Sequence, residues 1–358
     1  MKNVLTAGAA LLLTTSIASA GGLDRSGQGI GVIFEEGNHV ELSFGQVRPE
    51  VDGEVVLPTP GGPVTQESGN MAPDYTQFGA AVKVQVNEQV SMALIFDQPY
   101  GADVDYDTEG YILLGGRAEV ETTGITALAR YQFDETYSVH GGIRHLTANG
   151  IYAAPALPDF GSGASPAYTS TYSEDSGFAY VLGAAYERPD IALRVALTYT
   201  SEIELDLDGT AGDLSTTMPE SVNLDFQTGV AADTLLFGSI RWVAWDGFAL
   251  TDTLAGDILS YDDDVFTYNL GVGRRFTDNF SASVSMGYEK STGEVTGNLG
   301  PTDGYVSYQI GGAYTLDNGV EISGGVRYVD IGDATTSITA EFEDNSAIGV
   351  GMKVAYSF

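Results

Sequence analysis

The C-terminal stretch AIGVGMKVAYSF, residues 347–358, alternates strictly between two kinds of side chain. Every second residue is apolar, and the last one is aromatic: Ile348, Val350, Met352, Val354, Tyr356 and Phe358. The residues between them are small or polar. Because successive side chains of a β-strand point to opposite faces, this period of two predicts a strand with one apolar and one polar face.

The same period of two recurs through most of the chain. Many of the segments that show it are longer than the roughly 5–6 residues usual in soluble sheets. They match the roughly 9–11 residues of a tilted strand that crosses a bilayer. We predict fourteen such strands, at residues 39–48, 77–86, 89–105, 118–133, 137–149, 176–187, 191–206, 222–232, 235–246, 265–276, 280–292, 304–316, 319–331 and 345–358.

The connections between these segments alternate in length. Two-residue turns such as 87–88 and 317–318 alternate with long loops such as 153–175, 207–221 and 247–264. An even number of strands, with short turns at one end and long loops at the other, predicts an all-β transmembrane antiparallel β-barrel of about fourteen strands with both termini periplasmic. A soluble β-sandwich is the weaker alternative, because an apolar face repeated on every strand suits a barrel wall facing lipid.

Alternation also assigns side chains to the two faces of the wall. Basic residues on the polar face are expected to point into the lumen: Lys83, Arg130, Arg144, Arg194, Arg241, Arg275, Arg327 and Lys353. Aromatic residues near strand ends are expected to form girdles at the membrane interfaces. The candidates are Tyr137, Trp242, Trp245, Tyr305 and Tyr356.

The N-terminus predicts export and divides the chain into three parts. Lys2 precedes an apolar run at residues 6–17, and Ala18-Ser19-Ala20 has the small-x-small form of a signal-peptidase site. We therefore expect a cleaved signal peptide at 1–20, an N-terminal segment at 21–38 and the barrel at 39–358, in a bacterial outer membrane. The glycine-rich segment 21–38 is either a small plug folded into the barrel or a flexible leader.

Composition and motifs exclude several classes of function. The chain has 15 Lys and Arg against 49 Asp and Glu, and this balance argues against binding nucleic acid. The carboxylate clusters at 103–107 and 261–264 match no twelve-residue calcium loop, so we interpret them as solvated loop faces and expect no metal. With no Cys, three His and no GxSxG, HExxH or phosphate-loop motif, we expect neither an enzyme nor a cofactor.

Two long loops carry apolar side chains outside the predicted strands. The loop 247–260 contains Phe248, Leu250, Leu254, Ile258 and Leu259, and its four-residue spacing would line one face of a short helix. The loop 153–172 offers an opposing wall with Phe160, Tyr168 and Tyr172. Exposed apolar groups need a cover or a ligand. The two loops therefore either form a groove for a hydrophobic ligand or pack only on each other.

The chain resembles the FadL-type family of outer-membrane transporters for long-chain fatty acids and other hydrophobic compounds. Five stretches carry the resemblance: FEEGNHVELSFGQVRPEV (34–51), FDQPYGADVDYD (96–107), MPESVNLDFQTGVAADTLLFGSIRWVAWDGF (218–248), YNLGVGRRFTDNFSASVSMGYEKSTG (268–293) and GPTDGYVSYQIGGAY (300–314). The likeness spans most of the chain. The family's usual Asn-Pro-Ala element is absent before the first strand.

The resemblance implies passive uptake of a long-chain fatty acid or another hydrophobic small molecule, with exit sideways through the wall near strand three. Pro99 cannot donate a strand hydrogen bond, so Asp97, Pro99, Tyr100 and Gly101 are our candidates for this lateral opening. These residues alternatively begin an extracellular loop. Arg25 is the candidate partner for a fatty-acid carboxylate.

Two other functions stay open at this stage: a general diffusion porin with a polar, cation-favouring lumen, and a mainly structural barrel. The expected surroundings of the protein are outer-membrane lipid and lipopolysaccharide. We expect it to be a monomer.

Overall fold

The predicted alternation of side chains is the alternation between the outside and the inside of a closed wall. The structure, a computed structural model that describes residues 23–157 and 165–358, places Ile348, Val350 and Met352 of β24 (Ser346–Ser357) on the outer surface. Gly349 and Gly351 between them are buried on the inner face. The prediction of an all-β antiparallel barrel is confirmed. The signal peptide predicted at 1–20 lies outside the described residues.

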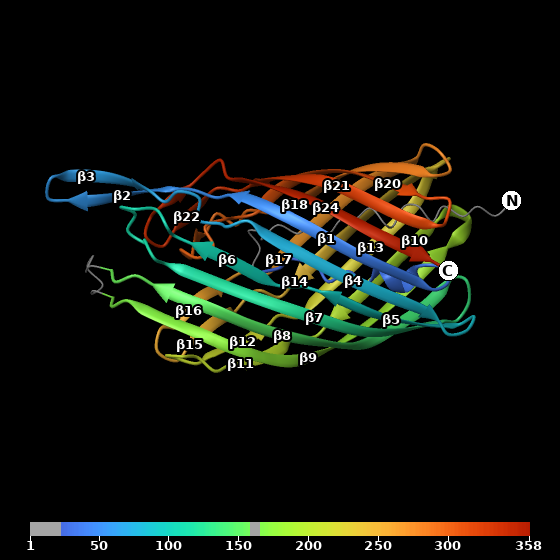
Figure 1. Ribbon diagram of the computed structural model, residues 1–358, viewed down its shortest axis with the longest axis horizontal. Helices are drawn as coiled ribbons and strands as arrows, with labels where there is room; N and C mark the ends of the chain where they lie inside the picture. Colours follow the sequence, from blue (N-terminus) through green and yellow to red (C-terminus); the bar gives the residue numbers. More distant parts are fainter. Residues whose placement is uncertain (1–22, 158–164) are drawn as a thin grey trace.

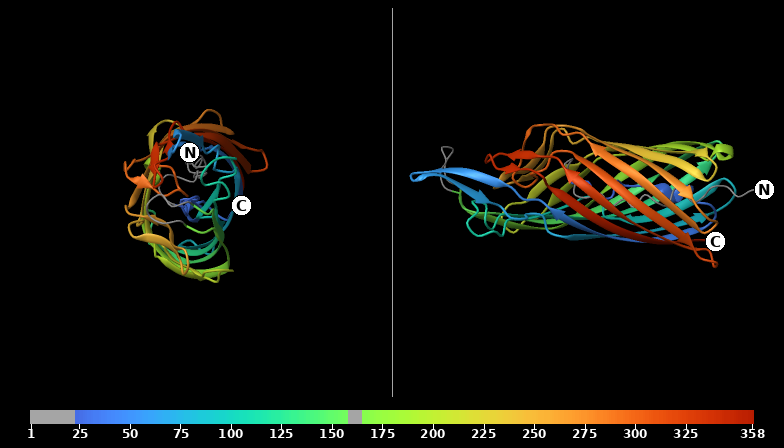
Figure 2. Two further views of the ribbon diagram at one scale, coloured as in Figure 1. Left: turned by 90° about the vertical axis from the view of Figure 1, so that its left-hand side faces the viewer. Right: turned by 90° about the horizontal axis from the view of Figure 1, so that it is seen from above.

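The wall closes where the two ends of the barrel meet. β24 pairs with β1 (His39–Glu50) along its length, from Ser357 opposite His39 to Ser346 opposite Glu50. In the described chain the wall has fourteen positions, because β5 (Val90–Asp97) and β6 (Gly101–Asp105) are successive parts of one strand that both pair with β7 (Arg117–Gln132) (Figures 1 and 2).

The remaining wall strands follow in chain order and pair with their neighbours. They are β4 (Tyr75–Gln85), β8 (Tyr137–Ala154), β9 (Tyr168–Arg188), β10 (Leu193–Thr200), β13 (Ser221–Ala231), β14 (Thr234–Val243), β17 (Val265–Arg275), β18 (Phe280–Glu289), β20 (Tyr305–Thr315) and β21 (Val320–Ile331). Short turns join them at the end where the C-terminus lies, which we call the turn end (Figure 1). The opposite end, with the long connections, is the loop end.

Two smaller sheets stand at the loop end. One has the order β11 (Ile203–Leu207), β12 (Leu214–Met218), β15 (Phe248–Asp252) and β16 (Gly256–Tyr261). The other joins β19 (Val295–Thr296), β22 (Ala334–Thr336), β23 (Glu341–Phe342), β2 (Glu54–Thr59) and β3 (Gly62–Glu67). The two described 3₁₀ turns are η2 (Gly31–Phe34) and η3 (Pro189–Ile191). Nowhere in residues 23–157 and 165–358 is a helix long and apolar enough to cross a membrane.

Residues 23–38, the N-terminal segment, run inside the barrel (Figure 2, left). Ile30, Val32 and Ile33 are buried against apolar side chains of β4, β5, β7 and β9. Burying these apolar groups against the inner face of the wall holds the segment inside the barrel. The segment therefore occupies part of the lumen.

The predicted inward direction is confirmed for the basic residues that are buried inside the wall or line the cavity in the lumen: Lys83, Arg130, Arg144, Arg194, Arg241, Arg327 and Lys353. The girdle prediction is correct for Tyr137 and Tyr356, which are exposed on the outer surface, and wrong for Trp245 and Tyr305. Trp245 is completely buried and packs edge-on against the rings of Tyr100 and Phe248. The chain beyond β14 turns inward at the loop end, where aromatic rings fill the mouth of the barrel.

Candidate functional site: apolar cavities and a gap in the wall

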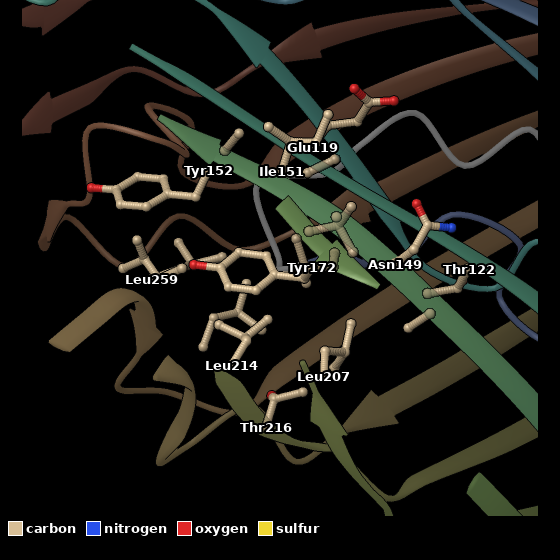
Figure 3. Close-up of a pocket in the computed structure, with 18 of the residues that line it drawn as sticks. Glu119, Thr122, Asn149, Ile151, Tyr152, Tyr172, Leu207, Leu214, Thr216 and Leu259 are labelled. Atoms are coloured by element: carbon tan, nitrogen blue, oxygen red, sulfur yellow. The ribbon is translucent and has the colours of Figure 1, made fainter. Parts of the chain in front are cut away.

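An apolar cavity lies in the barrel at the loop end, and we call it the mouth cavity. Its walls come from β7, β8 and β9 on one side and from the small sheet β11–β12–β15–β16 on the other. Figure 3 shows Leu207, Leu214 and Leu259 gathered around the ring of Tyr172. At its base it is bordered by Leu23 of the N-terminal segment. Its volume is about 50 Å³, so a ligand larger than a few atoms requires the lining side chains to separate.

The loop 247–260 forms a hairpin, so the predicted short helix is wrong. Phe248 pairs with Tyr261, and Asp252 pairs with Gly256, whose φ of 76° fits a tight turn. Phe248 and Leu250 point to the buried face with period two. The four-residue spacing of Leu250, Leu254 and Ile258 fits a strand as well as a helix, because four is a multiple of the two-residue period of a strand. The tight turn between Asp252 and Gly256 makes the segment a hairpin.

Asp252 ties this hairpin to the wall strand β9. The hydroxyls of Tyr168 and Tyr172 each donate to its Oδ2 at 2.7 Å, and the backbone N–H groups of Leu254 and Ala255 each donate to its Oδ1 at 2.7 Å. Burial acts to raise the pKa of Asp252, but these hydrogen bonds outweigh it and hold the pKa below its ordinary value. The ionised carboxylate therefore fixes one wall of the mouth cavity.

The predicted ligand-lining residues fall into three groups. Leu250, Ile258, Leu259 and Tyr172 line the mouth cavity. Phe248 and Tyr168 lie beside it and hold the surrounding elements, while Leu254 is 70% exposed at the hairpin turn, outside the cavity. Phe160 lies outside the described residues.

Sequence reasoning missed part of the lining, contributed by β11 and β12: Leu205, Leu207, Leu214 and Met218. We treated residues 207–221 as a loop, although apolar residues alternate at 203, 205 and 207. That alternation was the available signal for a hairpin folded over the mouth of the barrel.

A second apolar cavity, the rim cavity, lies near the other small sheet at the loop end. Val51, Met71, Val104, Val265 and Ile331 contribute apolar groups, and Leu23 and Arg25 border it from the N-terminal segment. Its volume is about 170 Å³. An apolar protein cavity of about 150 Å³ holds a benzene molecule. The rim cavity therefore has room for a single aromatic ring or a short length of alkyl chain.

The wall is interrupted beside these cavities. β5 ends at Asp97 and β6 begins at Gly101. β4 pairs with β5 only from residue 80 onward, while β6 pairs with β7 alone, so residues 75–79 of β4 face β6 without a strand ladder. A gap cavity of about 320 Å³ lies at this place. Pro99 packs towards Gly124, where a Cβ would lie 3.4 Å from the proline ring.

The N-terminal segment fills the interruption from inside. The N–H of Arg25 donates to Pro99 O at 2.8 Å, the N–H of Gly101 donates to Leu23 O at 2.8 Å, and Asp24 forms an antiparallel bridge with Tyr100. The Ser26 hydroxyl donates to Asp97 Oδ2 at 2.7 Å, and Gln28 Nε2 donates to the Tyr100 hydroxyl at 2.6 Å. Asp24 also pairs with Arg241 of the opposite wall.

Residues 23–25 thus separate the cavities. Leu23 borders the mouth and rim cavities, and Arg25 borders the rim and gap cavities. The four residues predicted for the lateral opening, Asp97, Pro99, Tyr100 and Gly101, all contact this segment through hydrogen bonds or the bridge.

Below the N-terminal segment, the lumen contains a polar cavity of about 250 Å³. Charges of both signs line it, among them Asp24, Asp225, Arg194 and Arg241. Within the described residues, no group of three or more His, Asp or Glu side chains is arranged to hold a metal ion.

The fold and these cavities together define a class of protein. A closed antiparallel barrel with an apolar outer surface and apolar cavities at the loop end is typical of an outer-membrane transport barrel. The family described as outer membrane protein transport protein (OMPP1/FadL/TodX) matches residues 32–358, so the chain belongs to this family. The family consists of transport proteins, in agreement with the prediction that the chain is not an enzyme.

Solved structures share the fold. A FadL homologue from Pseudomonas aeruginosa is 13% identical, with a TM-score of 0.74 and 92% of each chain covered. The toluene transporter TodX from Pseudomonas putida is 11% identical, with a TM-score of 0.67 and coverage of 95% of this chain and 96% of TodX. The CymD monoaromatic hydrocarbon channel is 14% identical, with a TM-score of 0.58 and coverage of 94% and 98%. A comparison with curated proteins found no match.

Proposed function

We propose that the protein takes up hydrophobic small molecules passively and releases them sideways into the outer membrane. The substrate binds first among the apolar side chains of the mouth and rim cavities. It then passes the N-terminal segment at Leu23 and Arg25 and leaves through the gap between β4 and β6. Two substrate classes enter the proposal: long-chain fatty acids, and uncharged hydrophobic molecules such as the toluene named for TodX.

The observation that carries this proposal is the position of the wall gap beside the apolar cavities. Leu23 and Arg25 are the shared boundary of mouth, rim and gap cavities, so a short movement of one segment connects them. Each 100 Å² of apolar surface removed from water contributes roughly 2.5 kcal/mol. A route that ends in lipid keeps this gain, whereas the polar lumen cavity would return the solute to water.

The general diffusion porin is the second candidate, and the polar lumen cavity is the observation that favours it. Against it, Ile30, Val32 and Ile33 place buried apolar groups inside the lumen, where a porin would need a water-filled path. We propose that the protein acts as a monomer surrounded by lipid and lipopolysaccharide, because its cavities and its gap are formed within one chain.

The test compares two tryptophan substitutions on one hairpin. Leu250→Trp fills the mouth cavity, whereas Leu254→Trp adds the same ring at the exposed turn. In cells that produce the full chain, uptake of labelled dodecan-1-ol above the empty-vector level should fall about tenfold with Leu250→Trp and stay unchanged with Leu254→Trp. Equal uptake in both variants defeats the proposed route. Large steady conductance in planar bilayers, unaffected by dodecan-1-ol, would favour the porin.

A further inference from the structure

Carboxylates surround the gap. Asp103 of β6 lies opposite Glu119 of β7, and Gly101 lies opposite Glu121, so the register brings these acidic side chains to one place. Together with Asp74, they line the gap cavity. Glu119 pairs with Arg117 at 2.6 Å and Asp74 with Arg48 at 3.3 Å. Among the described residues, Asp103 and Glu121 form no ion pair.

Arg25 faces the same cavity from inside the barrel. Its side chain is only 9% exposed, its guanidinium lies 4.1 Å from the centre of the Tyr75 ring, and it packs against Gly101. Within the described part of the chain, its Nε has no hydrogen-bond acceptor and its guanidinium has no ion pair. A buried N–H without an acceptor points to a ligand atom that supplies one.

The charges that line the gap cavity are unequal. Four carboxylates and one guanidinium line it, so the local field is negative despite Arg25. Asp103 is half-buried in this lining, and charges at a protein surface interact more strongly than in bulk water. An ionised carboxylate on the path therefore meets repulsion from Asp103 and Glu121, whereas an uncharged oxygen can accept the Arg25 N–H without this cost.

We propose that Arg25, Asp103, Glu119 and Glu121 make the gap a charge filter that passes uncharged hydrophobic molecules and rejects ionised ones of negative charge. The inference rests on the proposed lateral route and narrows its substrate class. A neutral alcohol, phenol, ketone or hydrocarbon passes. A fatty acid passes only in its protonated form.

The experiment uses two molecules with the same alkyl chain. Cells that produce the full chain are given labelled dodecan-1-ol or labelled dodecanoate at pH 7.5, and uptake is counted above the empty-vector level. We expect the alcohol to enter at least about tenfold faster than the carboxylate. In Glu119→Gln/Glu121→Gln, the ratio of dodecan-1-ol uptake to dodecanoate uptake should fall several-fold, because the carboxylate gains entry. The matched control, Glu202→Gln/Glu204→Gln, removes two exposed carboxylates at β11 and should leave the ratio unchanged.

The outcomes separate the filter from the proposed function. If the alcohol is not taken up, the proposed function fails, and the filter fails with it. If alcohol and carboxylate enter equally in the natural chain, uptake stands and the filter is wrong. If the carboxylate is excluded but Glu119→Gln/Glu121→Gln does not admit it, these side chains are not the filter. An equal gain in the β11 control assigns the effect to overall surface charge and also overturns the inference.

Discussion

A reversible covalent lock offers the sharpest test of movement in the N-terminal segment. The chain contains no Cys, so Asp24→Cys/Tyr100→Cys introduces the only two thiols. The N–H···O bonds between Gly101 and Leu23 and between Arg25 and Pro99 flank the bridge between residues 24 and 100. Residues 24 and 100 are therefore a non-hydrogen-bonded pair of an antiparallel ladder, a type of pair whose Cα atoms lie about 4.5 Å apart. That separation lies within the range that a disulfide spans.

The magnitude follows from the contacts that hold the segment. Five hydrogen bonds join residues 23–28 to residues 97–101 in the described structure. At about 1 kcal/mol each, they hold the segment closed by about 5 kcal/mol. The segment is therefore detached for only roughly 10⁻⁴ of the time. The double variant loses the bond from Gln28 to Tyr100 and the ion pair between Asp24 and Arg241, so its reduced form opens more often. Its oxidised form cannot separate at this point.

The assay is uptake of labelled dodecan-1-ol by the same cells before and after oxidation. Uptake should fall to the empty-vector level on oxidation and return on reduction, with disulfide formation followed by mass spectrometry. Because both states carry the same substitutions, the loss of packing by Tyr100 cancels in the comparison. The natural chain and each single-Cys variant control for the oxidant. Undiminished uptake with a complete disulfide would show that the segment does not gate the route.

Two further predictions concern the contacts around the cavities. Gly101→Ala places a Cβ 2.7 Å from the Arg25 guanidinium carbon and should displace the guanidinium from the Tyr75 ring. The backbone amides of residues 25 and 26 should then exchange hydrogen about fivefold faster. The control Gly29→Ala, whose Cβ meets nothing within 4 Å, should leave both exchange rates unchanged. The pKa of Asp252 is lowered in the folded state, so its tie to β9 is fully present above the ordinary carboxylate pKa of about 3.9 and is lost as pH falls through the lowered value. Hydrogen-exchange protection of amides 254 and 255 should therefore fall in acid, and Asp252→Asn, which loses about 1–3 kcal/mol of local stability, should show low protection at every pH. Exchange unchanged by Gly101→Ala, or acid-independent protection in the natural chain, would contradict the respective argument.

The strands of the wall could be predicted because their alternation of apolar and polar side chains is a property of neighbouring residues in the sequence. A strand that faces lipid on one side and the lumen on the other must alternate, and the candidate strand 345–358 follows from that rule. The interruption of the candidate strand 89–105 could be placed because Pro99 cannot donate to a ladder.

The loop end was less predictable, because long-range packing decides its structure. Leu250 and Leu254 fit a helix and a hairpin equally well by spacing, and only the turn closed by Asp252 and Gly256 separates them. Trp245 resembles an interfacial girdle residue in sequence, yet it is buried because rings from three distant segments meet there. Likewise, Arg25 contacts Pro99 and Gly101 at the break between β5 and β6, and no sequence pattern links these distant positions.

The seam between β1 and β24 also determines how the molecule is assembled. His39 and Ser357 are hydrogen-bonded neighbours although 318 residues separate them in the chain. Until that pair forms, the growing sheet has two open edges, and each edge carries a row of unpaired backbone N–H and C=O groups. Exposing these groups to lipid is costly, and they also pair readily with other chains. Closure is thus a late step of high contact order, and until it occurs the open edges must be protected by a catalyst of membrane insertion or by a chaperone.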